Sequence, residues 1–287
     1  RDLGSRDLGS RDLGRRGAGA GGPGPGYPGP GYPGPGYPGP GCPLRLLAAL
    51  LLLPGLAAAQ PIPRSVLPGL GRADPRQPVD RAAAPWRSLG RVQLETGGRC
   101  TGALIGPRLV LTAAHCLVAQ RTGVLVQPGT VHFMLGYDRG THLGHGRAVA
   151  LRIGAGYDPA TRSPGSADWA VLTLDTALGT PERVLPLAEP LPAPRTPLLL
   201  GGYQQDRPEV LLADRGCRLL GLSAAGPAAM LLHDCAATRG ASGAPLLVQK
   251  QDGGWTIAGV VSSVAVTMAF GAAVPAPAIA AALRSAP

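Results

Sequence analysis

The sequence has no C-x-x-C pair, although it contains five cysteines. This absence argues against a zinc knuckle and against a dithiol redox motif. One cysteine, Cys42, precedes an apolar segment that has the layout of a signal peptide. The other four lie along the chain as two close pairs, so we expect the disulfides Cys100–Cys116 and Cys217–Cys235 in an exported protein.

Lysine is almost missing, since Lys250 is the only one and arginine carries nearly all of the positive charge. The formal net charge is +10. The basic residues form no cluster along the chain beyond Arg15-Arg16, and no signature of a nucleic-acid-binding fold accompanies them. We therefore expect no nucleic-acid partner.

Closed metal-ligand patterns are lacking as well. Three histidines, His132, His142 and His145, lie close together in the sequence, but their spacing matches no closed zinc pattern. Loop histidines without a ligand are the simpler interpretation. The sequence predicts no metal site and no cofactor.

Long apolar runs that could span a bilayer are also missing from the first part of the chain. The run Leu46–Leu53 is too short to cross a hydrocarbon core of ~30 Å as a helix. It follows Arg45 and precedes a Pro-Gly break and the cleavage pattern Ala57-x-Ala59, so residues 44–59 are predicted to be a signal peptide. We expect a secreted or periplasmic protein with no stable membrane anchor after cleavage, and a membrane anchor is the alternative.

The segments on either side of residues 44–59 show no period of a packed helix or strand. Residues 1–16 repeat Arg-Asp-Leu-Gly-Ser and residues 22–41 repeat Gly-Tyr-Pro-Gly-Pro, without the glycine at every third position that collagen needs. We expect residues 1–43 to be disordered low-complexity sequence or an over-extended gene model. Residues 60–85 are rich in proline, arginine and alanine and are predicted to be a linker or a short propeptide.

From Trp86 onward, short apolar runs recur at intervals and are bounded by glycine, proline and aspartate. This spacing is typical of an all-β sandwich or barrel. No long amphipathic helical pattern occurs before Ala276–Arg284, which is predicted to be a short C-terminal helix.

A serine lies between two glycines in Gly240-Ala241-Ser242-Gly243. Because glycine tolerates backbone angles that other residues avoid, this turn can direct the N–H groups of Gly240 and Ser242 toward one point, as an oxyanion hole requires. The alternative is a plain serine–glycine turn between two strands. An α/β-hydrolase elbow is disfavoured because Ala244 replaces the last glycine of Gly-x-Ser-x-Gly.

A second stretch, Thr112-Ala113-Ala114-His115-Cys116, ends an apolar run with a histidine. It matches the histidine motif of the chymotrypsin/trypsin-like serine proteases residue for residue. Residues 240–245 resemble the Gly-Asp-Ser-Gly-Gly-Pro motif of that family, and residues 167–172 resemble its aspartate strand. Cys235 lies several residues before the serine, and this pattern resembles the bacterial secreted branch related to V8-like glutamyl endopeptidases.

The resemblance implies two antiparallel six-stranded β-barrels of the chymotrypsin type within residues 86–287. It also implies roles for three residues: Ser242 is the nucleophile, His115 is the general base, and Asp168 orients His115. Rival aspartates are Asp138, Asp158 and Asp175, of which Asp158 is typical of a turn. Ala241 replaces the aspartate that pairs with a new N-terminal ammonium in trypsin-like enzymes, so that activation switch is not expected.

By motif alignment, the specificity pocket consists of Ala236 at its base, Ala237 on one wall, and Ser262 and Val264 on another. These residues favour a small or apolar side chain before the scissile bond. We expect a monomeric, calcium-independent serine endopeptidase that acts on proteins or peptides. The alternatives are a catalytically silent protease-like binding protein and a structural protein organised by the N-terminal repeats.

Overall fold

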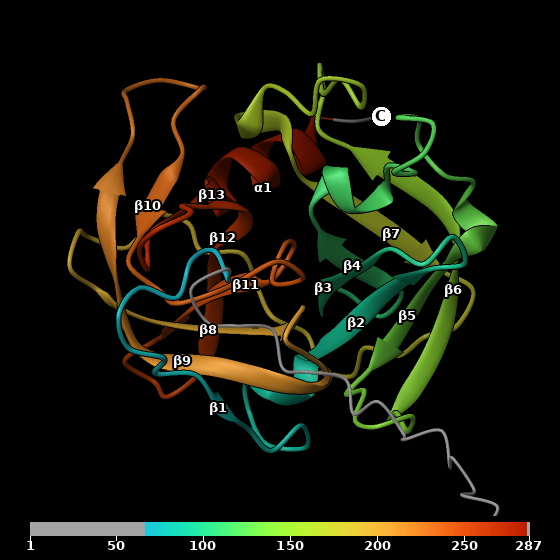
Figure 1. Cartoon of the computed structure of the whole chain (residues 1–287), viewed down its shortest axis with the longest axis horizontal. Coiled ribbons are helices and arrows are strands. Elements are labelled where there is room, and N and C mark those ends of the chain that lie inside the picture. Colours follow the sequence, from blue (N-terminus) through green and yellow to red (C-terminus); the bar gives the residue numbers. More distant parts are fainter. Residues whose placement is uncertain (1–66, 286–287) are drawn as a thin grey trace, which may run out of the picture. The chain divides into compact units, whose positions relative to one another are not determined.

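The structure, a computed structural model, describes residues 67–285 (Figure 1). The predicted low-complexity segment 1–43 and the predicted signal peptide 44–59 lie outside the described residues. Within the described part, no helix is long and apolar enough to cross a membrane. The short 3-10 helices are Trp86–Ser88, Ala114–Leu117, Pro128–Thr130 and Gly165–Ala167.

The first half of the described chain forms a closed antiparallel barrel with the strand order β2-β3-β4-β7-β6-β5. Its strands alternate between buried and exposed side chains, as in β5, where Val131, Phe133 and Leu135 are buried and His132 and Met134 are not. The six strands are β2 (Leu89–Leu94), β3 (Arg99–Leu104), β4 (Leu109–Thr112), β5 (Val131–Leu135), β6 (Gly144–Ile153) and β7 (Ala170–Leu174).

The second half forms a sheet with the order β9-β10-β13-β12-β11-β8, and pairing of β8 with β9 closes it. The prediction of two six-stranded antiparallel barrels is therefore confirmed, and Figure 1 shows the two groups of strands. The strands are β8 (Pro197–Gln204), β9 (Arg207–Leu222), β10 (Leu231–His233), β11 (Pro245–Gln249), β12 (Trp255–Val264) and β13 (Gly271–Pro275).

The C-terminal helix α1 (Ala276–Arg284) has the predicted bounds. The side chains of Ile279 and Ala280 in this helix are buried. The guanidinium of Arg152, on β6 of the first barrel, donates to the carbonyl oxygens of Ala282 and Leu283. These carbonyls belong to the last turn, where a helix leaves its acceptors unpaired, so Arg152 both caps α1 and ties it to the first barrel.

Polar contacts join the two barrels away from α1. The Arg91 guanidinium stacks 3.5 Å from the centre of the Tyr137 ring and pairs with Glu209 of β9 at 3.1 Å. The hydroxyl of Tyr203, on β8, donates to the carbonyl oxygen of Tyr137 at 3.0 Å. Because these groups come from both barrels, they fix the relative position of the segments that carry the site.

The segment before Trp86, which we expected to be a linker or a short propeptide, packs on the second barrel from Leu67 onward. The strand β1 (Gln77–Pro78) pairs with β9. Leu67 and Leu70 are buried in one apolar cluster with Ala236. The sequence does not show this packing because the partner of these two leucines lies far along the chain and no local period marks them.

His233 on β10 is fully buried. Its Nδ1 accepts the backbone N–H of Cys235 at 3.2 Å, while its Nε2 has no hydrogen-bond partner among the described residues. Burial disfavours the charged imidazolium and lowers the pKa of His233 to about 4. The side chain is therefore neutral in the folded protein at neutral pH.

We expect the stability of the protein to fall as the pH drops below about 6.5. In that range His233 is protonated in the unfolded chain, whereas its lowered pKa keeps it neutral in the folded chain. The loss through this residue approaches roughly 3 kcal/mol near pH 4. Urea denaturation at several pH values, with His233→Asn as the control, measures it. In the variant, the asparagine oxygen can replace Nδ1 as the acceptor without titrating. An identical pH dependence in both proteins would contradict this expectation.

Candidate active site

His115 lies in the 3-10 helix Ala114–Leu117, directly after β4. Its backbone N–H donates to Asp168 Oδ1 at 2.8 Å, and its Nδ1 lies 2.7 Å from Asp168 Oδ2. A carboxylate can only accept, so Nδ1 carries the proton of that hydrogen bond. The arrangement leaves Nε2 as the basic nitrogen of the neutral ring.

Asp168 precedes β7 and is almost fully buried. The hydroxyl of Ser262 donates to its Oδ2 at 2.6 Å. Burial alone would raise the pKa of Asp168, but the hydrogen bonds from His115 and Ser262 and the proximity of His115 outweigh it and hold that pKa below its usual value. The carboxyl is therefore ionised at neutral pH and orients the imidazole of His115.

The three rival aspartates bond elsewhere. Asp158 caps its own turn through Ala160 and Thr161. Asp175 accepts from the backbone of Arg147 and the side chain of Thr176, and Asp138 pairs with Arg139. Within residues 67–285, Asp168 is the aspartate that reaches His115.

The serine turn is fixed to the first barrel by Thr101 on β3. The backbone N–H of Thr101 donates to the carbonyl oxygen of Ser242, and its hydroxyl donates to the carbonyl oxygen of Gly240, both at 2.9 Å. Thr101 follows Cys100, whose disulfide to Cys116 holds the residue next to His115. One strand therefore positions the turn with Ser242 and the loop with His115 together.

Ser242 and His115 line the same cleft, which has a volume of about 1090 Å³. Ser242 is partly exposed, and its hydroxyl forms no hydrogen bond to any described residue. Catalytic hydrogen bonds are often long in a site without substrate and tighten only when substrate is bound. The hydroxyl is therefore available at the surface of the cleft that also contains the imidazole.

Gly240 occupies the left-handed region with φ +93, and a Cβ there would lie 2.2 Å from the carbonyl oxygen of Tyr203. The carbonyl oxygen of Arg239 accepts the N–H of Gln205 at 2.7 Å. The N–H groups of Gly240 and Ser242 have no acceptor within the described part of the chain. Two free backbone donors in such a turn have the arrangement that stabilises an oxyanion.

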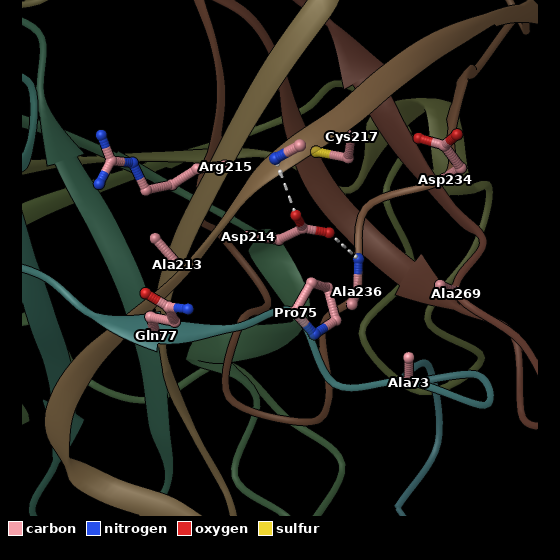
Figure 2. Close-up of a pocket in the computed structure, with 11 residues that line it drawn as sticks. Ala73, Pro75, Gln77, Ala213, Asp214, Arg215, Cys217, Asp234, Ala236 and Ala269 are labelled. Carbon is pink, nitrogen blue, oxygen red and sulfur yellow. Dashed lines mark hydrogen bonds between the residues drawn. The ribbon is translucent and has the colours of Figure 1, made fainter.

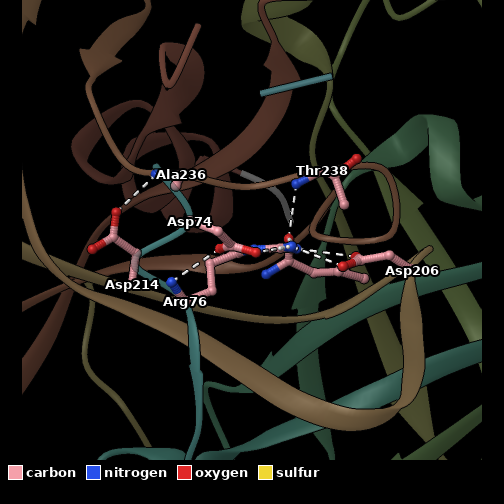
Figure 3. Close-up of polar contacts among 7 residues, drawn as sticks. Asp74, Arg76, Asp206, Asp214, Ala236 and Thr238 are labelled. Carbon is pink, nitrogen blue, oxygen red and sulfur yellow. Dashed lines mark hydrogen bonds and ion pairs between the residues drawn. The ribbon is translucent and has the colours of Figure 1, made fainter. Parts of the chain in front are cut away.

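The turn between β8 and β9 braces this loop, which the sequence did not indicate. The Oε1 atom of buried Gln204 accepts the N–H of Thr238 at 2.8 Å and Nη1 of Arg76 at 2.6 Å. The side chain of Gln205 adds a bond to the Thr238 hydroxyl at 3.1 Å. Arg76 is itself buried and pairs with Asp74 and Asp206, both at 2.8 Å (Figure 3).

We expect Gln204→Leu to lower kcat/KM by about tenfold or more, because it leaves the Thr238 N–H and the Arg76 guanidinium without their shared acceptor. Gln204→Glu places a carboxylate oxygen where the amide oxygen accepts these bonds, and it should retain most of the activity. Steady-state kinetics on folded variants, with thermal unfolding as the check on folding, measures both. Equal losses in the two variants would show that Gln204 does not act through these hydrogen bonds.

A small hollow of about 160 Å³ lies beside Ser242. The predicted pocket residues Ser262 and Val264 line it, and Ser262 also binds Asp168. The hollow is lined by Thr238, Arg239, Ser242, Val261, Ser262, Ser263 and Val264.

The structure does not place Ala236 and Ala237 on this hollow, because both are fully buried. The N-terminal segment covers them instead. Gly69 accepts the N–H of Ala237 at 3.0 Å, and a Cβ on Gly69 would lie 1.9 Å from the Ala237 carbonyl oxygen and 3.1 Å from Val264 Cβ. Gly69 therefore packs closely between Ala237 and Val264, and Val264 is one of the residues that line the hollow.

A further cavity of about 630 Å³ shares no lining residue with the cleft of His115 and Ser242. It lies between the N-terminal segment and β9, and Asp214 crosses it to accept the N–H groups of Gly216 and Ala236 (Figure 2). The second disulfide, Cys217–Cys235, joins β9 to the segment that follows β10. These hydrogen bonds and the disulfide connect β9 to Cys235 and Ala236.

Both predicted disulfides are present, Cys100–Cys116 and Cys217–Cys235. The sulfur atoms of the first lie close enough to His115 to suggest a metal-ligand group. They are bonded to each other, however, and are not the thiolates that a metal ion would need. Disulfides of this kind are typical of exported proteins.

Comparisons with known proteins agree with this geometry. The family model described as Trypsin matches residues 76–281. A solved structure described as Glu endopeptidase in complex with MPD has a TM-score of 0.62 and 20% sequence identity, and the match covers 75% of this chain and 98% of that chain. At that identity the likeness shows the fold alone. No curated protein sequence matches the chain. Since the family model covers most of the chain, this protein belongs to the trypsin family of serine endopeptidases, in its chymotrypsin-like double-barrel form.

Proposed function

We propose that the protein is an exported serine endopeptidase that hydrolyses peptide bonds through His115, Asp168 and Ser242. The observation that carries the proposal is the hydrogen bond of 2.7 Å between His115 and buried Asp168, in the cleft that also contains the turn of Ser242. The free N–H groups of Gly240 and Ser242 support it.

In the proposed reaction, Ser242 Oγ attacks the carbonyl carbon of the scissile bond and His115 Nε2 takes its proton. The N–H groups of Gly240 and Ser242 bind the oxyanion that forms. Collapse of this intermediate expels the amine, which receives the proton from His115, and leaves an ester on Ser242. Water then attacks the ester with His115 again as the base, and Ser242 is released with its proton. Asp168 stabilises the imidazolium during both steps.

The small hollow beside Ser242 supports a preference for a small side chain before the scissile bond. Its volume is about 160 Å³, and Gly69 packs closely behind Val264, one of its lining residues. A digest of a peptide library, with Ser242→Ala as the control, tests this preference. Frequent cleavage after large or basic residues would contradict it.

We also propose that residues 44–59 are a signal peptide, that the exported protein begins near Gln60, and that it acts as a monomer without a membrane anchor. The packing of Leu67, Leu70 and Arg76 against the second barrel supports retention of residues 67–85 in the active enzyme. Sequencing the N-terminus of the exported protein tests the cleavage site of the signal peptide and the retention of residues 67–85. A mature protein that begins after Trp86 would contradict the retained segment.

Labelling with a fluorophosphonate probe tests the enzymatic function directly. We expect the folded wild-type protein to react and Ser242→Ala to remain unlabelled, because the probe forms a covalent bond only with an activated serine. The alternative is a binding protein with a silent site. That alternative would be favoured by a folded wild-type protein that does not react, or by labelling that persists in Ser242→Ala.

A further inference from the structure

The cleft of His115 and Ser242 is strongly positive. Among the described residues, four arginines line it, Arg99, Arg121, Arg162 and Arg239, and no aspartate or glutamate does. All four are exposed. They lie far apart in the sequence, which is why no basic cluster is visible along the chain, and folding brings them to one cleft.

None of these four guanidinium groups forms an ion pair or a side-chain hydrogen bond within residues 67–285. Elsewhere in the same part of the chain, Arg76, Arg91, Arg147 and Arg284 all pair with carboxylates. A guanidinium presents a planar set of donors that matches a carboxylate in two parallel hydrogen bonds. The arginines of the cleft therefore remain available for carboxylates of another molecule.

The positions of the arginines connect this charge to the reacting atoms. Arg239 directly precedes Gly240 and lines both the cleft and the small hollow beside Ser242. Arg99 directly precedes Cys100, and Arg121 lies in the loop after Cys116, so both are close to the disulfide beside His115. An extended peptide advances about 3.3 Å per residue, so its side chains on either side of the scissile bond would meet these groups.

We infer that the substrate of this cleft is a peptide with acidic residues close to the scissile bond and a small residue directly before it. The inference rests on the proposed peptidase function and specifies its substrate class. The four charges attract an acidic segment and raise its rate of encounter, an effect that reaches roughly 10-fold to 1000-fold for clefts lined by one sign of charge. Because each exposed pair contributes little by itself, the selectivity comes from the group.

Matched peptides test the inference. All carry alanine before the scissile bond, and the neighbouring positions carry either aspartate and glutamate or the uncharged asparagine and glutamine. We expect kcat/KM to be at least about tenfold higher for the acidic peptides at about 20 mM salt, and this ratio to shrink at about 500 mM salt, where the charges are screened. A ratio near one at low salt would overturn the inference.

Variants assign the effect to the cleft. The double variant Arg99→Gln/Arg121→Gln removes two of the four charges and is expected to lower the ratio of acidic to neutral peptides severalfold toward one. Arg218→Gln removes one positive charge from an exposed position on β9 that does not line the cleft, and it should leave the ratio unchanged. Equal loss in the double variant and in Arg218→Gln would overturn the assignment.

Two further outcomes separate this inference from the function on which it rests. Cleavage that depends on Ser242 but shows no preference for acidic peptides leaves the peptidase function intact and overturns the substrate class. Failure of the fluorophosphonate probe to label the folded protein overturns both. Inhibition by a single-stranded oligonucleotide at concentrations where poly-glutamate has no effect would assign the positive cleft to a nucleic acid and overturn the acidic peptide.

Discussion

Replacing Asp168 with asparagine is expected to lower kcat by about ten-thousandfold with little change in KM. The Oδ2 atom of Asp168 accepts from both His115 and Ser262, and Oδ1 accepts the backbone N–H of His115. If the amide nitrogen of asparagine takes the place of Oδ2, it presents a donor to Nδ1, and the imidazole must then carry its proton on Nε2. A ring in that tautomer cannot accept the proton of Ser242.

Ser262→Ala provides the matched control for this prediction. It removes one donor to the Asp168 carboxylate but leaves the carboxylate and its bonds to His115 in place. The expected loss in kcat is about tenfold, close to the value of a single hydrogen bond to a charged group. Steady-state kinetics and the rate of fluorophosphonate labelling measure both variants. Asp168→Asn with more than a tenth of the wild-type kcat would show that this carboxylate does not orient the base.

The parts of the site that could be predicted from the sequence are those set by neighbouring residues. His115 and Ser242 lie in short motifs whose backbone geometry is local, and the glycines of the second motif are required by their positive φ. The strands and the helix Ala276–Arg284 follow from short-range apolar patterns in the same way. Pairing the cysteines needed only their closeness along the chain.

The remaining parts depend on contacts between distant residues. Arg76 reaches Gln204 across the fold, and Gly69 meets Ala237 and Val264, so no local pattern could mark either contact. Ser262 was expected on a wall of the specificity pocket, and its bond to Asp168 depends on the packing of β12 against the first barrel. In each case the contact joins segments that are distant in the sequence, either the N-terminal segment and the second barrel or the two barrels.

Ala241 shows how one substitution changes the support of the site. In this chain the residue is fully buried, and a Cβ on Gly202 would lie only 3.1 Å from the Ala241 Cα atom. The position therefore has neither a charge nor room for an ammonium partner. The loop is supported instead by Gln204 and by the buried guanidinium of Arg76. Because these contacts lie within residues 67–285, we expect the activity not to depend on a newly formed N-terminus.

Gly240→Ala is expected to lower kcat by about 100-fold to 1000-fold, the loss that follows when an oxyanion donor is displaced. A Cβ at this position would lie 2.2 Å from the Tyr203 carbonyl oxygen, which is backbone of β8 and cannot move aside. The residue must therefore shift, and its N–H leaves the point that it shares with the N–H of Ser242. The measurement is kcat on a small peptide substrate.

Gly253→Ala is the control that separates this collision from backbone strain. Gly253 has φ +82, close to the φ +93 of Gly240, but a Cβ there meets no atom within 4 Å. Gly253→Ala should lose about 1–2 kcal/mol of stability because alanine is strained in the left-handed region, and Gly240→Ala should lose at least as much because the collision adds to that strain. Only Gly240→Ala should lose kcat, since only there does the strain relax by moving an oxyanion donor. Loss of kcat in both variants would mean that reduced stability, and not the displaced N–H, limits the reaction.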